Sequence, residues 1–155
     1  MRFYVVLFLL LLFSCKPLSI SNTKITCKSG YDCEVNYYEE TELIEKNDGL
    51  NQLYLSHKEN SNYNLVSVNV AASEQPIKAQ DMPQIMYFFN FKTSPKSAIK
   101  SLKVYKKINC KCPDAGLVQL KNIKVTMVEN QQHAYLQLLG DELDLLEGSV
   151  LLKLR

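Results

Sequence analysis

Apolar and polar residues alternate over short stretches of this chain, which predicts β-strands rather than helices. Residues 66–70 read Val-Ser-Val-Asn-Val, so we expect one face of a strand here to be buried and the other to be solvated. Residues 85–91 are apolar at both odd and even positions, which is typical of a central strand covered on both faces. Alternation recurs over 123–127, and the tail predicts a meander with strands at 134–138, 143–145 and 150–154.

The start of the expected domain predicts a hairpin. In residues 24–38 the apolar positions alternate on both sides of Ser29-Gly30, which favours a turn. The polar stretch that follows predicts a helical turn over 42–46 and a short strand over 50–55. Asparagine clusters with aspartate, glycine or serine predict turns at 47–49 and 60–62.

Residues 95–105 fit two interpretations. Ser94 and Pro95 suit the N-cap and the first position of a helix, and the apolar residues that follow are spaced as on one helix face. Between the lysines, however, Leu102 and Val104 alternate as on a strand. We favour a short helical turn from 95 to about 101 that leads into a strand running through Cys110.

Many short strands, separated by turn signals about every eight to twelve residues, predict a mainly β fold. We expect an antiparallel β-sandwich, Ig-like in architecture, with at most one or two short helical turns. This single domain would comprise residues 24–155, which is an ordinary domain length and enough to bury a core without covalent staples.

The N-terminus carries the features of an export signal. Arg2 precedes an unbroken apolar run over residues 3–13, which is too short to span a bilayer, since spanning takes about 20 apolar residues. The stretch Leu12-Phe13-Ser14-Cys15 resembles the lipobox of bacterial lipoproteins. The resemblance implies that residues 1–14 are a signal peptide, that Cys15 carries lipid such as palmitate, and that residues 15–23 form a lipidated tether.

Two other interpretations of the leader are less favoured. An ordinary secretory signal, giving a secreted protein, would end in an A-x-A-like pattern, and none occurs near residues 10–22. An uncleaved anchor would need a longer apolar run. Lys16 stands where the enterobacterial pattern for inner-membrane retention has Asp, so the resemblance favours the outer membrane of the bacterial cell envelope.

With Cys15 assigned to lipid, an even number of cysteines remains. In an exported chain this favours disulfides. Zinc is less favoured, because the spacings Cys-x5-Cys and Cys-x-Cys differ from those of usual zinc ligand pairs. A bond between the last two cysteines would close a very small ring, which argues against it, although redox pairs of this spacing exist. The candidates are Cys27, Cys33, Cys110 and Cys112.

Two segments of opposite charge carry the two cysteine pairs. Residues 32–48 contain seven acidic residues and one lysine, whereas residues 92–111 contain seven lysines and no acid. We expect the two segments to be neighbours, clamped by disulfides between the pairs rather than within them. A bond between Cys27 and Cys33 is also feasible, so all three connectivities stay open.

The sequence contains no recognisable catalytic motif. His57 and His133 lack a metal-ligand or catalytic spacing, and neither a Gly-x-Ser-x-Gly elbow nor a phosphate-binding glycine loop occurs. The carboxylates at 39–40 and 141–144 lack the spacing of a calcium loop. The formal net charge of +2 gives no indication of nucleic-acid binding. We expect no metal, no cofactor and no nucleic acid.

Tyrosine and asparagine gather at two places that are candidates for a binding surface. We expect a monomeric, non-catalytic binding or assembly-accessory module that contacts another envelope protein or a glycan. The alternative is a periplasmic inhibitor or immunity-type protein, which the acidic segment would suit; a carboxylate-based hydrolase ranks last. The candidate surface residues are Tyr37, Tyr38, Asn62, Tyr63 and Asn64.

Overall fold

The structure of the protein is a computed structural model that describes residues 25–73, 83–93, 99–129, 134–147 and 150–154. Within these ranges the chain forms ten β-strands and no helix, which confirms the predicted mainly β class. The expected signal peptide, Cys15, the expected tether and His133 lie outside the described residues.

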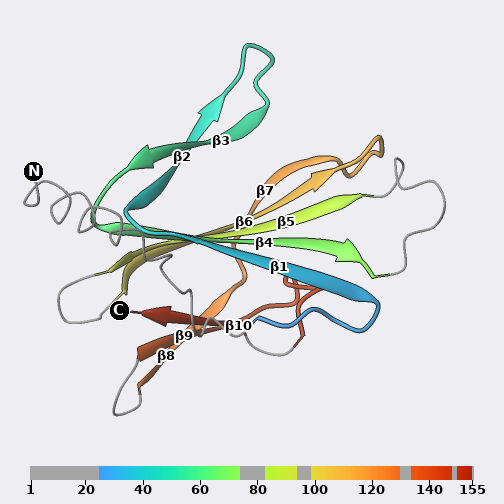
Figure 1. The fold of residues 1–155 in the computed structure, drawn as a ribbon. Coiled ribbons are helices and arrows are strands. Elements are labelled where there is room, and N and C mark those ends of the chain that lie inside the picture. The colour runs from blue at the N-terminus through green and yellow to red at the C-terminus, as the bar shows by residue number, and fades with distance from the viewer. Residues whose placement is uncertain (1–24, 74–82, 94–98, 130–133, 148–149, 155) are drawn as a thin grey trace, which may run out of the picture.

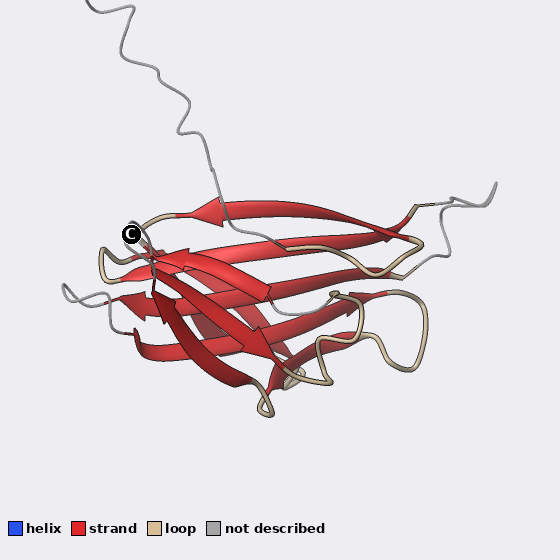
Figure 2. Ribbon diagram, turned by 90° about the horizontal axis from the view of Figure 1, so that it is seen from below, coloured by secondary structure: helices blue, strands red, loops and turns tan. Residues whose placement is uncertain are grey.

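The strands form three antiparallel sheets (Figure 1, Figure 2). The large sheet has the order β1-β4-β5-β6-β7, the small sheet has the order β10-β9-β8, and β2 pairs with β3 in a separate hairpin. The bounds are β1 Tyr31–Tyr38, β2 Thr41–Asn47, β3 Leu53–Glu59, β4 Tyr63–Ala72, β5 Gln84–Thr93, β6 Ile99–Asn109, β7 Gly116–Leu120, β8 Lys124–Glu129, β9 Ala134–Leu139 and β10 Val150–Leu154.

The inner face of the large sheet packs against the small sheet, which lies below it in Figure 1. On β5 the odd-numbered Tyr87, Phe89 and Phe91 are fully buried, and Leu136 and Leu138 of β9 complete the same core. Burial of each large apolar side chain stabilises the fold by about 1.5–3 kcal/mol. This packing confirms the predicted β-sandwich.

The outer face of the large sheet is covered in part by the β2–β3 hairpin. Leu43 of β2 packs with Leu65 of β4 and Tyr105 of β6 in a second, smaller core, and Phe88 of β5 lies against it. Strand β5 therefore contributes side chains to both cores from the centre of the sheet. The prediction that residues 85–91 form a central strand covered on both faces is confirmed.

Most of the expected strands and turns are confirmed. Residues 66–70 lie in β4, and β3 begins within the expected strand 50–55. The expected solvated face of the 66–70 strand is wrong, because Ser67 is 4% exposed on the face that the β2–β3 hairpin covers in part. Both expected turns are closed by backbone hydrogen bonds, from Asn51 N to Asp48 O at 3.1 Å and from Tyr63 N to Asn60 O at 3.0 Å. The other confirmed strands are those expected near 123–127, 134–138 and 150–154, which correspond to β8, β9 and β10.

The expected hairpin over 24–38 is wrong. Strand β1 pairs with β4 along its whole length, and Cys27 instead forms an isolated bridge with Leu146. The reason is the number of backbone hydrogen bonds each partner offers. β4 provides a partner for every residue of β1, whereas the short segment before the turn could pair with only a few of them.

Both expected helical turns are also wrong where the structure describes them. Residues 42–46 lie in β2, and residues 99–101 lie in β6, while residues 95–98 are outside the described ranges. Each segment pairs with a neighbour, β2 with β3 and β6 with β5, and this pairing outweighs the local helical spacing. The expected strand 143–145 is a pair of turns that buries Leu143 and Leu146 in the main core.

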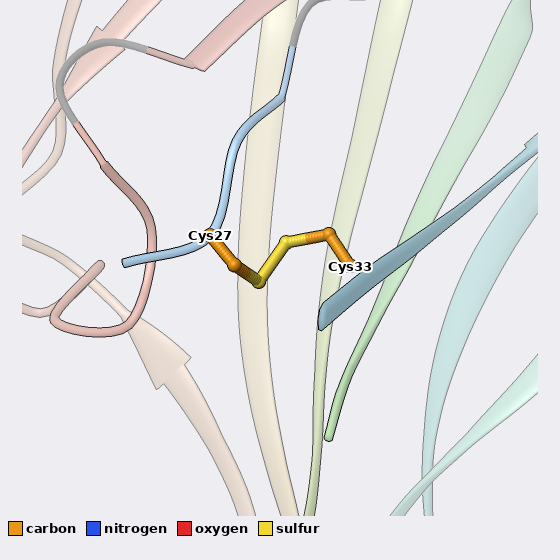
Figure 3. Close-up of a disulfide and its surroundings, with 2 residues drawn as sticks. All are labelled: Cys27 and Cys33. Atoms are coloured by element: carbon orange, nitrogen blue, oxygen red, sulfur yellow. A yellow bond between two sulfur atoms is a disulfide. The ribbon is translucent and has the colours of Figure 1, made fainter. Parts of the chain in front are cut away.

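The disulfides lie within the two cysteine pairs, so the expected cross-links between the pairs are wrong. Cys27 bonds to Cys33 (Figure 3), and Cys110 bonds to Cys112, with Cα atoms 5.6 Å and 5.3 Å apart. In the large sheet, β4 and β5 separate β1 from β6. At about 4.8 Å per strand, β1 and β6 lie roughly 14 Å apart, which is beyond the reach of a disulfide.

The acidic and basic segments lie close together, as expected, but β2 makes the contact instead of a disulfide. Strand β2, which carries part of the acidic segment, packs over the outer face of the large sheet. There Glu45 forms an ion pair with Lys103 of β6 at 3.0 Å. The opposite charges therefore meet where the hairpin packs on the face of the large sheet, and not between neighbouring strands of one sheet.

Candidate binding cleft

A cleft of about 440 Å³ lies between the β2–β3 hairpin and the outer face of the large sheet. It forms because β2 is the strand that packs down on β4 and β5, while β3 extends toward β7 and leaves space beneath it. Figure 1 shows the hairpin standing off the sheet on the side opposite the small sheet. A volume of this size is ordinary for a small-ligand site, where about 300–1,000 Å³ is typical.

The lining of the cleft combines aromatic rings with neutral hydrogen-bonding groups. Tyr38, Tyr54 and Phe88 provide rings from three different strands. No lining residue is a carboxylate, and Lys107 is the one lysine among them. The neutral polar lining residues are Asn36, Gln52, Ser67 and Asn69, with His57 beside them.

Asn69 has an unusual environment for a lining residue. Its Nδ2 donates to Glu34 at 3.3 Å, whereas its Oδ1 is buried without a hydrogen-bond partner among the described residues. A buried acceptor left unsatisfied costs about 1–3 kcal/mol.

Asn90 anchors the hairpin to the sheet. It is 2% exposed on β5, and its Oδ1 accepts a hydrogen bond from Leu43 N of β2 at 3.1 Å. Its Nδ2 donates to Thr41 O at 2.9 Å and to Asn64 O at 3.1 Å. One buried amide therefore joins the backbones of β2 and β4, and this fixes the closed side of the cleft.

Glu45 makes a second attachment between the hairpin and the sheet. Its carboxylate accepts a 2.6 Å hydrogen bond from the Tyr105 hydroxyl and a 3.0 Å hydrogen bond from Lys103 Nζ. The bond from Tyr105, followed by that from Lys103, holds the pKa of Glu45 below its ordinary value. Burial, and then the bond to Glu45, raise the pKa of Tyr105.

A second, shallower hollow of about 340 Å³ adjoins the cleft at the turn between β1 and β2. Tyr38 and His57 line both hollows, with their ring centroids 6.4 Å apart. Three carboxylates line the second hollow, from Glu39, Glu40 and Glu59. The two hollows therefore differ in charge: Lys107 is the one lysine in the carboxylate-free lining of the cleft, whereas the second hollow is acidic, with three carboxylates beside Lys58.

The structure separates the residues expected to form a binding surface. Tyr38 lines the cleft, whereas Tyr37 points to the opposite face and packs against the main core. Asn62 lies in the β3–β4 turn, Tyr63 lies under the Lys92 ammonium at 5.5 Å, and Asn64 bonds to Asn90. Of the five, only Tyr38 belongs to the cleft.

The C-terminal carboxylates have structural partners. Asp144 accepts hydrogen bonds from the Tyr87 hydroxyl at 2.7 Å and from Lys106 Nζ at 2.8 Å. Glu142 accepts one from Asn122 N at 3.2 Å. In the part of the chain that the structure describes, no three metal-ligating side chains gather at one place.

Sequence reasoning missed the anchor and most of the lining. Asn90 carried a usable signal, because it is the one polar residue in the apolar run 85–91, and a polar group in a buried strand needs partners. The lining residues carried no such signal. They come from six strands and from the β2–β3 turn, and the strand order that brings them together is not visible in the sequence.

Comparisons of the chain with protein-family models, curated proteins and solved structures find no match. In the described residues, no helix has the length and apolar character needed to cross a membrane.

Proposed function

We propose that the chain is an envelope-anchored lipoprotein that acts as a non-catalytic binding module, with the cleft under β3 as its site for a short glycan. The observation that carries this proposal is the lining, which combines aromatic rings with amide and hydroxyl groups and contains one lysine, Lys107, and no carboxylate. A lipid on Cys15 would keep this site close to the membrane, as the lipobox resemblance implies.

A glycan suits this lining better than a charged or wholly apolar ligand. Sugar rings present apolar C–H faces that pack on aromatic side chains such as Tyr54 and Phe88. Their hydroxyls are donors and acceptors that match the amide and hydroxyl side chains of the lining, such as Asn36, Ser67 and Asn69. Pockets of this kind use apolar contact for affinity and a few polar groups for orientation.

The test is calorimetric titration of the mature chain with soluble peptidoglycan oligosaccharides. We expect binding by the wild type and about tenfold weaker binding by Tyr54→Ala, which corresponds to about 1.4 kcal/mol. Tyr31→Ala is the matched control, since Tyr31 is also partly exposed but lines neither hollow. Equal binding by the two variants would contradict the assignment of the cleft.

The anchor has an independent test. Processing of the wild-type chain is expected to be sensitive to globomycin and to give an acylated product, and both properties should vanish in Cys15→Ser. Acyl labelling that survives this substitution would contradict the lipid attachment. A crosslinking pull-down from intact envelopes, made with the same pair, would show whether contacts depend on the anchor.

A second candidate is an inhibitor or immunity-type protein, and the acidic hollow favours it. Glu39, Glu40 and Glu59 give one end of the hairpin a net negative charge, although Lys58 lines the same hollow. Such a surface would attract a basic enzyme and speed its association. Co-purification of a basic hydrolase or toxin from envelopes, lost in Glu40→Lys/Glu59→Lys, would support this candidate over the glycan-binding module.

A further inference from the structure

The two disulfides of the chain lie in contrasting environments. Cys27 and Cys33 are both half-buried and pack against the main core. Figure 3 shows that their bond joins the segment before β1 to β1 itself. The same segment is fixed to the small-sheet side of the molecule by hydrogen bonds from Lys28 N to Leu145 O and from Glu147 N to Thr26 O. This disulfide therefore ties the entry of the chain to the body of the fold.

The second disulfide lies in the loop between β6 and β7, away from both cores. Cys110 is half-buried and Cys112 is exposed, and neither belongs to a core cluster. Since only one residue separates the two cysteines, the bond restricts very little of the unfolded chain. The loop ends already have another restraint, because β6 and β7 pair as far as Ile108 and Gly116. The bond is therefore a minor contributor to the fold.

A hydrogen-bonded turn and the start of β7 fix the backbone on the C-terminal side of this disulfide. Ala115 N donates to Cys112 O at 3.1 Å, which closes a turn with Pro113 at its second position, where proline is favoured. Gly116 then begins β7 with φ of 145°, a conformation that favours glycine. The cysteines are thus held between a paired strand end and a closed turn, with Cys112 open to solvent.

The charge around the disulfide favours thiolate chemistry. Lys111 lies between the cysteines and is exposed. The one acid in the connection to β7 is Asp114. Positive charge beside a cysteine stabilises the thiolate, which is the form that attacks a disulfide and the form that leaves one.

From this contrast we infer that Cys110–Cys112 is a thiol–disulfide exchange site for cysteine thiols of other exported proteins, whereas Cys27–Cys33 is structural. A client thiolate attacks Sγ of Cys112, the Cys110–Cys112 bond breaks, and Cys110 leaves as a thiolate. A second client thiolate then attacks the client sulfur of the mixed disulfide and releases Cys112. The client dithiol is oxidised by two electrons, and the two protons it loses are taken up by Cys110 and Cys112.

This exchange needs no oxidant beyond the disulfide itself for one turnover, and it does not depend on what the cleft binds. The first test is a time course of reduction of the mature, folded chain by a fixed excess of reduced glutathione, with samples alkylated at intervals and analysed by peptide mapping. We expect Cys110 and Cys112 to become alkylated at least tenfold faster than Cys27 and Cys33. Equal rates, or earlier reduction of Cys27–Cys33, would overturn the proposal.

The second test measures transfer to a client. A reduced, unstructured peptide with two cysteines is incubated anaerobically with the oxidised chain, and the peptide disulfide is quantified. We expect close to one equivalent of oxidised peptide from the wild type and none from Cys110→Ser/Cys112→Ser. The matched variant Lys111→Glu should keep the yield but slow the reaction severalfold at low salt, where charge effects are least screened. A yield from the wild type no higher than that from the double variant would overturn the proposal.

Discussion

Tyr105 of β6 donates a 2.6 Å hydrogen bond to the carboxylate of Glu45 in β2, and this contact attaches the hairpin to the outer face of the large sheet. The cleft exists only while the hairpin stays in this position, because β2 is the one strand that pairs with β3 among the strands that the structure describes. Contacts between β2 and the sheet therefore determine both the local stability of the hairpin and the shape of the site.

Tyr105→Phe is expected to lower the free energy of unfolding by about 1 kcal/mol. The substitution keeps the buried ring but removes the hydroxyl, and a hydrogen bond to a charged group contributes about 1.5–3 kcal/mol. The expected value lies below that range because the Glu45 side chain is 35% exposed and is partly solvated. Urea unfolding of the two proteins checks this value. A stability equal to that of the wild type would show that the contact does not hold the hairpin.

Asn90→Ala is expected to destabilise the protein by about 2–3 kcal/mol, more than Tyr105→Phe does. The substitution leaves the Leu43 N–H and two carbonyl oxygens without their partner. Asn109→Ala is the matched control, since Asn109 is exposed at the end of β6, and we expect it to change stability by less than about 0.5 kcal/mol. Denaturant unfolding measures both, and similar values for the two variants would contradict the anchoring role of Asn90.

The Glu45–Tyr105 contact also makes stability depend on pH. The pKa of Glu45 is lowered by its hydrogen bonds from the ordinary 4.5, so its contribution is fully present above about pH 4.5 and is lost as the pH falls through the lower folded value. The pKa of Tyr105 is raised by burial from 10.0, so its contribution is fully present below pH 10 and is lost as the pH rises further. The difference in unfolding free energy between wild type and Tyr105→Phe should therefore be largest between these limits. A difference that stays constant from pH 3 to pH 11 would contradict this linkage.

Tyr87→Phe is expected to lower the free energy of unfolding by about 1 kcal/mol, because it weakens the contact between the two layers of the sandwich. The Tyr87 hydroxyl donates to Asp144 in the loop between β9 and β10, and Lys106 lies 5.7 Å from the centroid of the same ring. The remaining Lys106–Asp144 ion pair is 2.8 Å long, but the Asp144 side chain is 51% exposed, so the pair contributes little by itself. Thermal unfolding of Tyr87→Phe and of Tyr87→Phe/Lys106→Met tests this. A double variant much less stable than the single variant would contradict the small contribution of the ion pair.

Strands whose own residues show a clear apolar pattern could be predicted from the sequence. The run 85–91 is apolar on both parities, and it proved to be the central strand with a core on each side. The segment 42–46 had no such pattern, because its place in β2 depends on pairing with β3 and on the partners that Asn90 provides. The same dependence explains the cysteines. Their pairing follows from the number of strands between β1 and β6, which is a property of sheet order and not of spacing along the chain.

The cleft could not be predicted for a related reason. Tyr54 of β3, Ser67 of β4 and Phe88 of β5 all line it although they are far apart in the sequence. Tyr38 and Tyr37 are neighbours in sequence but lie on opposite faces of β1, as successive residues of a strand must. The Tyr37-Tyr38 pair in the sequence therefore indicated the correct strand, but only one of the two tyrosines lines the cleft.

The proposed glycan site is tested most directly by a heteronuclear NMR titration of the mature chain with soluble peptidoglycan oligosaccharides. We predict saturable shift changes confined to the cleft, strongest at Tyr54, Ser67 and Asn69, and unaffected residues at Tyr31 and Gln137 on other surfaces of the molecule. Shift changes that are absent, or that centre on the acidic hollow instead, would contradict the proposal that this cleft binds a glycan.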